Sequence, residues 1–367
     1  MAILLYPQDQ HQDAGFYSFL FDALTRHAGA RKAVGNRPLP RMQQPRQHES
    51  VWIEWNGIRV LVDMSDHIFL FDLPALRMCD VYLKANLNQP MAEKVLARAG
   101  AMDCHNKLRP FMFLPPARLA AYSGLERATR LLRKGRWRPF DFCHVVGVYN
   151  NPFLNGVPPE ASMDITADPR TNHFWTRYQI QRALQNTGMK GFCRLTNRGN
   201  AALLDPKGVV KANLNNRTFQ LAMLASRMTV LNTLPHALFP WKALESMALG
   251  IPFVAERRPQ IMMPEALELV PGRHYLELLP ELPGFAESAD QDDLRAYRVF
   301  PEIRLERLRE RAEWLKGEIC NHGRMAEMLA EVDSYRRRVL NPPFIAQFFA
   351  DTVAQAIKGK GVPACGS

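Results

Sequence analysis

Residues 226–256 read SRMTVLNTLPHALFPWKALESMALGIPFVAE, and this stretch decides the fold. The apolar run at 228–233 predicts a strand, residues 240–249 predict a helix, and residues 252–256 predict the next strand. Gly250 follows the helix directly, at the position where a left-handed backbone commonly ends one. A strand, a helix and a strand in this order form a βαβ unit, so we expect a parallel sheet.

The same alternation of strands and helices extends through the second half of the chain. Strands separated by helices in this way indicate a doubly wound α/β domain. The further elements that we expect are strands at 142–148 and 191–196, helices at 175–187 and 217–226, and helical tails at 302–339 and 343–358.

The first half of the chain also contains short apolar runs separated by turns. Asn56-Gly57 lies between two of them and predicts a hairpin. The expected strands lie at 2–6, 51–55, 58–62 and 80–87, and the expected helices at 16–27, 92–99 and 116–134. Because Gly135 and Pro139 punctuate the chain after the last helix, we place a domain boundary at residue 138.

Composition limits the class of protein. The chain has 367 residues, which is long for one core and suits two domains. Hydrophobic residues make up 47% and charged residues 23%, as in a soluble globular protein. No apolar run approaches the ~18 residues of a membrane span, and the N-terminus lacks the basic start of a secretory signal. The six cysteines are scattered without metal-ligand spacing, so we expect free thiols in the cytoplasm.

The formal net charge of +11 favours acidic partners, which include nucleic acid, anionic lipid and phosphorylated small molecules. The basic residues are dispersed and form no known nucleic-acid-binding module, so nucleic acid is not the expected partner. A basic nucleic-acid-binding protein stays open as an alternative of a different class. The stretch 127–138 (RATRLLRKGRWR) fits either a solvated helix face or a peripheral contact with the inner face of an anionic membrane.

Residues 240–256 carry the side chains that we expect to bind a ligand. In doubly wound domains, ligands bind beyond the carboxyl ends of the strands, where helices begin. The helix start at 240–242 favours a phosphate because its N–H groups and dipole attract anions, and Lys242 adds a positive charge. Glu245, one turn later, can accept hydrogen bonds from ribose hydroxyls. The alternative is an ordinary βαβ unit in which Glu245 faces solvent.

The same residues resemble the donor-domain signature of the GT-B glycosyltransferases, which has the pattern (F/W)-x-x-x-E-x-(M)A-x-G-x-P-(V/F)-V. The matching positions are Trp241, Glu245, Met247, Ala248, Gly250, Pro252 and Val254. In that family the glutamate holds the ribose of a nucleotide-sugar donor, and the resemblance implies this role for Glu245. Many members have a second glutamate eight positions earlier, where this chain departs from the pattern with Ala237.

Two weaker matches flank the signature. Residues 271–278 (PGRHYLEL) resemble the segment that follows it in the family. Residues 140–151 (FDFCHVVGVYNN) resemble the first strand of the donor domain, with Gly147 near its carboxyl end. The resemblance therefore covers about the second half of the chain.

The resemblance implies an α/β fold of two Rossmann-like domains facing a cleft (GT-B), with C-terminal helices. The acceptor-binding domain would span 1–138 and the donor-binding domain 139–340, and a C-terminal helix and tail at 341–367 would pack back on the first domain. The implied activity moves a sugar from a nucleotide-sugar donor to a glycan or lipid-linked acceptor, as in the synthesis of a bacterial lipopolysaccharide or capsule. A nucleotide-sugar epimerase of the same fold is the enzymatic alternative.

We place the nucleotide-sugar site at Glu245, Lys242, Trp241, Arg217, Gly147 and His236. Arg217 opens a helix whose start faces the cleft in the GT-B pattern, and arginine suits bidentate phosphate contacts. Weaker candidates near element ends are Arg177, Arg194, Arg198 and Lys211. We expect no metal and no other cofactor, because positive side chains and a helix N-terminus would stabilise the diphosphate of the co-substrate.

A catalytic base or nucleophile should follow a strand of the first domain. One cluster, Asp63, Asp66 and His67, follows the strand at 58–62, and a second, with Asp9, His11 and Asp13, follows the strand at 2–6. We favour the first cluster and, within it, Asp66. An Asp or His could deprotonate an acceptor hydroxyl in an inverting reaction, and a carboxylate could attack the sugar in a retaining one. Each cluster could equally be a solvated turn.

Overall fold

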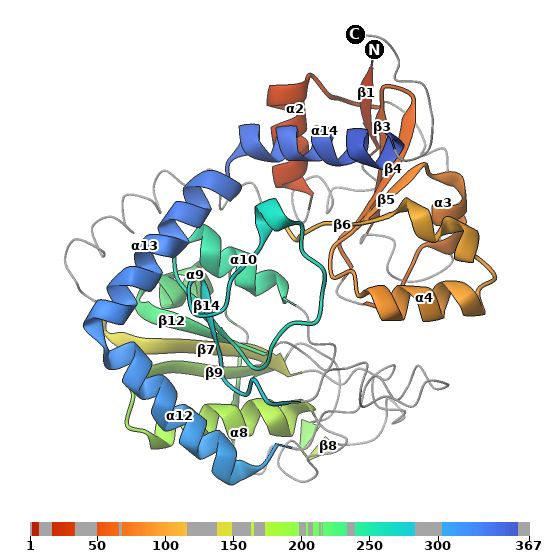
Figure 1. Cartoon of the computed structure of the whole chain (residues 1–367). Helices are drawn as coiled ribbons and strands as arrows, with labels where there is room; N and C mark the ends of the chain where they lie inside the picture. The colour runs from red at the N-terminus through yellow and green to blue at the C-terminus, as the bar shows by residue number, and fades with distance from the viewer. Residues whose placement is uncertain are drawn as a thin grey trace. The chain divides into compact units, whose positions relative to one another are not determined.

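The structure, a computed structural model, divides into two units, and Figure 1 traces the chain through them. Unit 1 comprises Met1–Tyr122, Ile261–Glu268 and Ser334–Ser367, and unit 2 comprises Ser123–Gln260 and Leu269–Asp333. The boundaries at 138 and 340 that we derived from the sequence stay predictions. The ranges that the structure describes are 2–6, 17–33, 50–65, 68–115, 138–148, 163–164, 173–197, 203–204, 208–212, 214, 216–232, 239–282 and 303–358.

A mixed six-stranded sheet forms the centre of unit 1, in the order β2-β1-β3-β4-β5-β6. β3 and β4 form the predicted antiparallel hairpin, which turns at Asn56 and Gly57 with positive φ angles of 52° and 85°. β4, β5 and β6 run parallel. The elements of this unit are β1 (Ile3–Tyr6), α2 (Ser18–Ala28), β2 (Arg31–Lys32), β3 (Ser50–Trp55), β4 (Ile58–Asp63), α3 (Leu73–Met78), β5 (Val81–Lys84), α4 (Gln89–Arg98), η2 (Met102–Lys107), β6 (Leu108–Pro110), η3 (Glu265–Leu267) and α14 (Pro342–Lys358).

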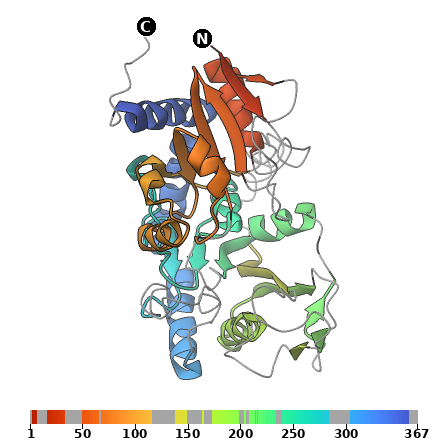
Figure 2. The ribbon, with the colours of Figure 1, turned by 90° about the vertical axis from the view of Figure 1, so that its right-hand side faces the viewer.

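Helices cover both faces of this sheet, because neighbouring residues of a strand point to opposite sides. α3, α4 and η2 share a core with Trp52, Leu61 and Tyr82 of the sheet. α14 contacts β5, and its Phe349 ring lies 5.2 Å from that of Trp55, measured between centroids. Trp55 and Trp52 are an odd number of positions apart, so α14 covers the opposite face. Figures 1 and 2 both show α14 lying against α2.

A parallel six-stranded sheet forms the centre of unit 2, in the order β11-β9-β7-β12-β13-β14. Numbered along the chain, this is the order 3-2-1-4-5-6 of the doubly wound dinucleotide-binding fold. The elements of this unit are β7 (Phe140–Val148), β8 (Met163–Asp164), α8 (His173–Asn186), β9 (Gly191–Asn197), β10 (Leu203–Leu204), β11 (Val210–Lys211), α9 (Asn216–Leu224), β12 (Ser226–Leu231), α10 (Trp241–Ala248), β13 (Phe253–Ala255), β14 (Tyr275–Glu277) and α12 (Leu305–Cys320).

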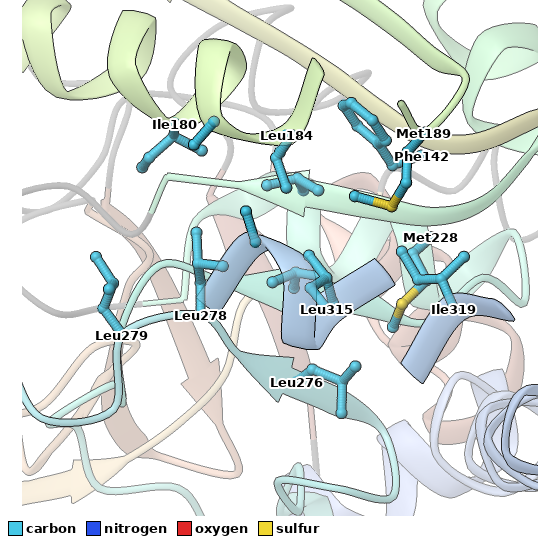
Figure 3. Close-up of a cluster of buried hydrophobic side chains, with 14 of the residues drawn as sticks. Phe142, Ile180, Leu184, Met189, Met228, Leu276, Leu278, Leu279, Leu315 and Ile319 are labelled. Atoms are coloured by element: carbon cyan, nitrogen blue, oxygen red, sulfur yellow. The ribbon is translucent and has the colours of Figure 1, made fainter. Parts of the chain in front are cut away.

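The main core of unit 2 lies between its sheet and the helices α8 and α12. Phe142, Met228 and Leu276 of the strands gather there with Ile180 of α8 and Leu315 of α12 (Figure 3). α9 and α10 lie on the other face, where the Ser246 hydroxyl donates to that of Thr229 at 3.0 Å. Helices on both faces bury the central strands β7, β12 and β13.

The helical tail that we predicted at 302–339 is not continuous. It is two helices, α12 and α13 (His322–Val339), with Asn321 between them. Asn321 has a ψ angle of 99°, and its side chain accepts the backbone N–H of Arg324 at 3.1 Å. Asparagine prefers this capping role to a helix interior because its side chain replaces a backbone acceptor, and our prediction overlooked it.

The α/β fold class with C-terminal helices is confirmed. The helix and strands predicted within 226–256 are confirmed as β12, α10 and β13, and Gly250 has the expected left-handed backbone with a φ angle of 69°. The predicted helix at 116–134 lies outside the described residues. Within the described ranges, none of the helices combines the length and hydropathy of a membrane span.

Gly191, the first residue of β9, allows the Phe142 ring to lie against its backbone. An ideal Cβ at this position would stand 2.6 and 2.7 Å from the Cε1 and Cε2 atoms of Phe142. Gly191→Ala should therefore lower the free energy of unfolding by about 1–3 kcal/mol, since the buried ring has to shift. Gly317→Ala, in α12 with nothing near its Cβ, should leave it unchanged or raise it by up to about 1 kcal/mol. Urea denaturation of both variants checks this, and equal effects would contradict it.

Candidate functional site

The strand order of unit 2 contains one point where the chain reverses direction. From β7 the chain moves outward through β9 to β11, then crosses back to β12 on the other side of β7 and continues to β13 and β14. The switch point therefore lies between β7 and β12. In doubly wound domains, ligands bind outside the carboxyl ends of the strands at this point.

The backbones of β7 and β12 part at the switch point. Their pairing ends at Cys143 and Thr229. β7 stays paired with β9 as far as Val148, and β12 stays paired with β13 as far as Leu231. Beyond Thr229 and Cys143, side chains rather than backbone groups connect the two strands.

Lys242 brings the first turn of α10 to this point. Its ammonium donates to the carbonyl of Val145 in β7 at 2.9 Å and lies 4.7 Å from the centre of the Phe219 ring of α9. The first N–H groups of a helix are not bonded within it, and its dipole favours an anion there. The resulting cationic and N–H-rich edge suits a phosphate group.

The remaining predicted donor residues have different positions. Gly147 lies near the end of β7, and the half-buried Trp241 and Glu245 lie in α10. Arg217 is exposed in the first turn of α9. His236 lies outside the described residues. The structure thus brings Lys242 to the carboxyl half of β7 and places Glu245 one turn further along the same helix.

The weaker arginine and lysine candidates also differ in their burial and in their hydrogen-bond partners. Arg177 is buried in α8 and donates to the carbonyl of Gly147, so it fixes the end of β7. Arg194 is half-buried in β9, and the exposed Lys211 donates to the Gly208 carbonyl at 2.9 Å. Arg198 lies outside the described residues.

Three polar side chains at the switch point were not predicted from the sequence. His144 Nε2 lies 3.1 Å from Asn232 Oδ1, and Asn232 Nδ2 donates to Glu256 Oε2 at 3.3 Å. All three are buried, and they belong to or directly follow β7, β12 and β13. The available signal was a polar residue two positions after a core residue at each strand end, where the core residues are Phe142, Val230 and Val254.

The thiols near the switch point are not candidates for nucleophiles. Burial raises the pKa of Cys143 and of Cys193 to about 12. A thiol with such a pKa is protonated at neutral pH and is a poor nucleophile. Among the described residues, no three His, Cys, Asp or Glu side chains gather as metal ligands.

The carboxyl edge of the unit 1 sheet carries the predicted catalytic cluster. Asp63, the last residue of β4, is buried, and its Oδ1 accepts the N–H of Ser65 at 2.8 Å. Its Oδ2 accepts the Tyr82 hydroxyl at 2.6 Å and the Lys84 ammonium at 3.0 Å. Lys84 is fully buried and also donates to Ser65 Oγ at 2.9 Å. Asp63 therefore holds the turn that follows β4.

Tyr82 acts in this cluster as a donor. Burial, followed by the charge of Asp63, raises the pKa of the Tyr82 phenol well above its usual value, so the phenol keeps its proton. Asp66 and His67, which follow Asp63 in the predicted cluster, lie outside the described residues. The second cluster, at 9–13, also lies outside them.

No protein-family model matches the chain, and no curated protein matches it. Among solved structures, Anabaena Alr3699/HepE in complex with UDP and glucose aligns with 14% identity and a TM-score of 0.41, covering 80% of this chain and 71% of that one. Its complex with UDP-glucose gives 14% identity and a TM-score of 0.39, covering 78% and 68%. The wall teichoic acid polymerase TagF gives 12% identity and a TM-score of 0.27, covering 78% and 60%. Similarity of this degree assigns no substrate and no residue role to this chain.

Lys84 should be essential for the stability of unit 1. Lys84→Met leaves Asp63 as a buried carboxylate without its cation, which typically costs about 3–5 kcal/mol of unfolding free energy. Arg26→Met, which breaks an exposed pair with Asp22, should cost less than about 1 kcal/mol. Chemical denaturation measures both, and a Lys84→Met variant as stable as the wild type would contradict the ion pair.

His144 should make the stability of unit 2 depend on pH. Burial lowers its pKa from 6.5 to about 4, so between these values the unfolded chain binds a proton that the folded chain excludes. The contribution of His144 is complete above about pH 6.5 and is lost as the pH falls through about 4, with a maximum near 3 kcal/mol. His144→Gln cannot titrate, so its unfolding free energy should fall less over this window. Parallel slopes for the two proteins in urea titrations would contradict the burial of a neutral ring.

Proposed function

We propose that this chain is a glycosyltransferase that moves a sugar from a nucleotide-sugar donor to a glycan or lipid-linked acceptor without a metal ion. The donor would bind at the carboxyl edge of the unit 2 sheet, at the switch point between β7 and β12. The 2.9 Å hydrogen bond from Lys242 to the Val145 carbonyl carries the proposal, because it joins the first turn of α10 to β7 just beyond the point where β7 and β12 part. The helix with the GT-B signature thus begins where doubly wound domains bind nucleotides.

Different parts of the nucleotide-sugar donor would bind to different groups at this edge. The first turn of α10 and the Lys242 ammonium supply positive charge for a diphosphate. Glu245 lies one turn further along α10 and is half-buried, which suits a carboxylate that accepts hydrogen bonds from two ribose hydroxyls. Trp241, Arg217, Gly147 and His236 complete the proposed donor site.

The catalytic group would come from the segment after β4. Both oxygens of Asp63 are already engaged by Ser65, Tyr82 and Lys84, so this carboxylate suits anchoring better than proton transfer. We therefore keep Asp66 as the proposed base or nucleophile, with His67 as the alternative. Asp63 would anchor the backbone at Ser65, the residue before Asp66 in the chain.

The acceptor and cellular setting are part of the proposal. The net charge of +11 suits an acceptor with phosphate or other acidic groups, as in a bacterial surface glycan or its lipid carrier. A cytoplasmic enzyme with peripheral contact to the inner face of an anionic membrane, through residues 127–138, would meet such an acceptor.

A nucleotide screen tests the donor. We expect one of UDP, GDP, dTDP and CMP, alone or as its sugar conjugate, to raise the melting temperature in a saturable way, since a ligand that binds only the folded state stabilises it. Absence of a shift with all of them would overturn the proposal. Incubation with the selected nucleotide sugar alone separates the epimerase alternative, which would convert the sugar without an acceptor.

Glu245 should contribute to affinity through ribose alone. Glu245→Ala should weaken binding of the selected nucleotide by about 10–100-fold, because hydrogen bonds to a charged group contribute about 1.5–3 kcal/mol. The 2′,3′-dideoxy form of this nucleotide has no ribose hydroxyls to donate to Glu245. It should therefore bind the wild type and Glu245→Ala with equal affinity. Glu313→Ala, an exposed site in α12, is the control. Equal losses for the two nucleotides in calorimetric titrations would exclude a ribose contact.

A further inference from the structure

Four buried polar side chains form a row across the sheet of unit 2. They are Gln181 of α8, His144 of β7, Asn232 after β12 and Glu256 after β13, with exposed fractions of 8%, 0%, 7% and 2%. Polar groups are seldom buried side by side unless they satisfy one another, because each loses its hydration. The row therefore needs a structural or functional explanation.

The row lies at the carboxyl edge of the main core. Phe142, Val230 and Val254 belong to that core, and His144, Asn232 and Glu256 each follow one of them by two positions. Residues two apart in a strand share a face. The polar row is thus the layer next to the apolar core, on the face covered by α8, at the edge where β7 and β12 part.

The hydrogen bond between Asn232 and Glu256 sets the direction of the row. The amide nitrogen of Asn232 donates to Glu256 Oε2 at 3.3 Å. The amide oxygen of Asn232 then faces His144 Nε2 at 3.1 Å and must accept a proton from it. A neutral imidazole carries one proton, so Nε2 is protonated and Nδ1 is a bare acceptor.

Gln181 meets the other side of the ring. It forms a side-chain interaction with His144, yet Gln181 Oε1 and His144 Nδ1 both lack a hydrogen-bond partner among the described residues. Both atoms are acceptors in this arrangement, so they cannot bond each other. A half-turn of the Gln181 amide exchanges its oxygen for an N–H donor and provides the partner that Nδ1 lacks.

We propose that His144 is a positioning residue, held neutral with its proton on Nε2, which fixes Asn232 and, through it, Glu256 at the edge of the donor site. It replaces the backbone pairing that β7 and β12 lack beyond Cys143 and Thr229. The inference rests on the proposed function, because the edge that it orders is the one that would hold the nucleotide. It goes further by assigning a role to a residue outside the signature.

The charged groups around the ring agree with a neutral imidazole. Desolvation lowers the pKa of His144 most. The side-chain interactions of the ring with Asn232 and Gln181 oppose this, and the positive charges of Arg177 in α8 and Lys242 in α10 lower the pKa further. Glu256, after β13, accepts a hydrogen bond from Asn232, which lies between it and the ring. A second proton on the ring would also remove the acceptor that faces Gln181.

Two isosteric variants test the position of the donor atom. Glutamine has its amide nitrogen three bonds from Cβ, as Nε2 of histidine is, whereas the amide nitrogen of asparagine corresponds to Nδ1. His144→Gln can therefore still donate to Asn232, and His144→Asn cannot. Using UDP as the probe and GDP in a second series, we expect affinity within about threefold of the wild type for His144→Gln and a loss of about tenfold or more for His144→Asn.

Val146→Ala is the matched control, because it shortens the next buried side chain on the same face of β7 and leaves all four polar side chains of the row in place. It should destabilise the fold but leave nucleotide affinity within about threefold of the wild type. Equal affinities for His144→Gln and His144→Asn would overturn the positioning role. A loss in Val146→Ala as large as that in His144→Asn would overturn it as well.

Nitrogen-15 spectra of histidine-labelled protein test the row without any ligand. The signals that disappear in His144→Gln should be those of a ring protonated at Nε2, and they should not change between about pH 8 and about pH 5.5. A proton on Nδ1, or titration near the ordinary value, would overturn the inference. If neither UDP nor GDP binds the wild type while the spectra are as expected, the donor-site role fails and the hydrogen-bonded row stands.

Discussion

The backbone pairing between β7 and β12 ends at Cys143 and Thr229, whereas each strand continues on its other side with β9 or β13. This separation lies where the chain, wound in one direction from β7 through β9 to β11, crosses over to β12 and continues in the other direction. The arrangement of unit 2 depends on this separation of β7 from β12. Beyond Cys143, the carbonyls of Val145 and Gly147 in β7 accept hydrogen bonds from Lys242 of α10 and Arg177 of α8.

Each unit places buried polar side chains at the carboxyl edge of its parallel strands. In unit 1 a fully buried lysine meets a buried aspartate, and in unit 2 a neutral histidine meets an amide. Neither arrangement is an efficient source of stability, because desolvation offsets most of what the contacts contribute. Each of the two arrangements holds the backbone segment that follows a strand in a fixed direction. Rigid strand ends are where α/β proteins hold ligands, so these groups fit a role in shaping sites.

The two edges differ in the groups that surround their buried polar side chains. The His144 ring is kept neutral by burial and by neighbouring positive charge. The Asp63 carboxylate accepts hydrogen bonds from Ser65, Tyr82 and Lys84, so both of its oxygens are engaged. Proton transfer in the proposed reaction falls to another residue, for which Asp66 is the candidate.

The sequence by itself determined the α/β class, the hairpin at Asn56-Gly57, the βαβ unit at 226–256 and the left-handed Gly250, because turn residues and the periods of apolar side chains are local properties. It also predicts a donor-site role for Glu245 and Lys242, since the residues that resemble the signature are contiguous in the chain. The break at Asn321 was equally local but was overlooked. Only the tertiary structure decided the strand order, the switch point and the partnerships of Asp63 with Lys84 and of His144 with Asn232. These partners lie far apart in the chain, and which strands become neighbours depends on how all the helices pack, so no local pattern contains that information.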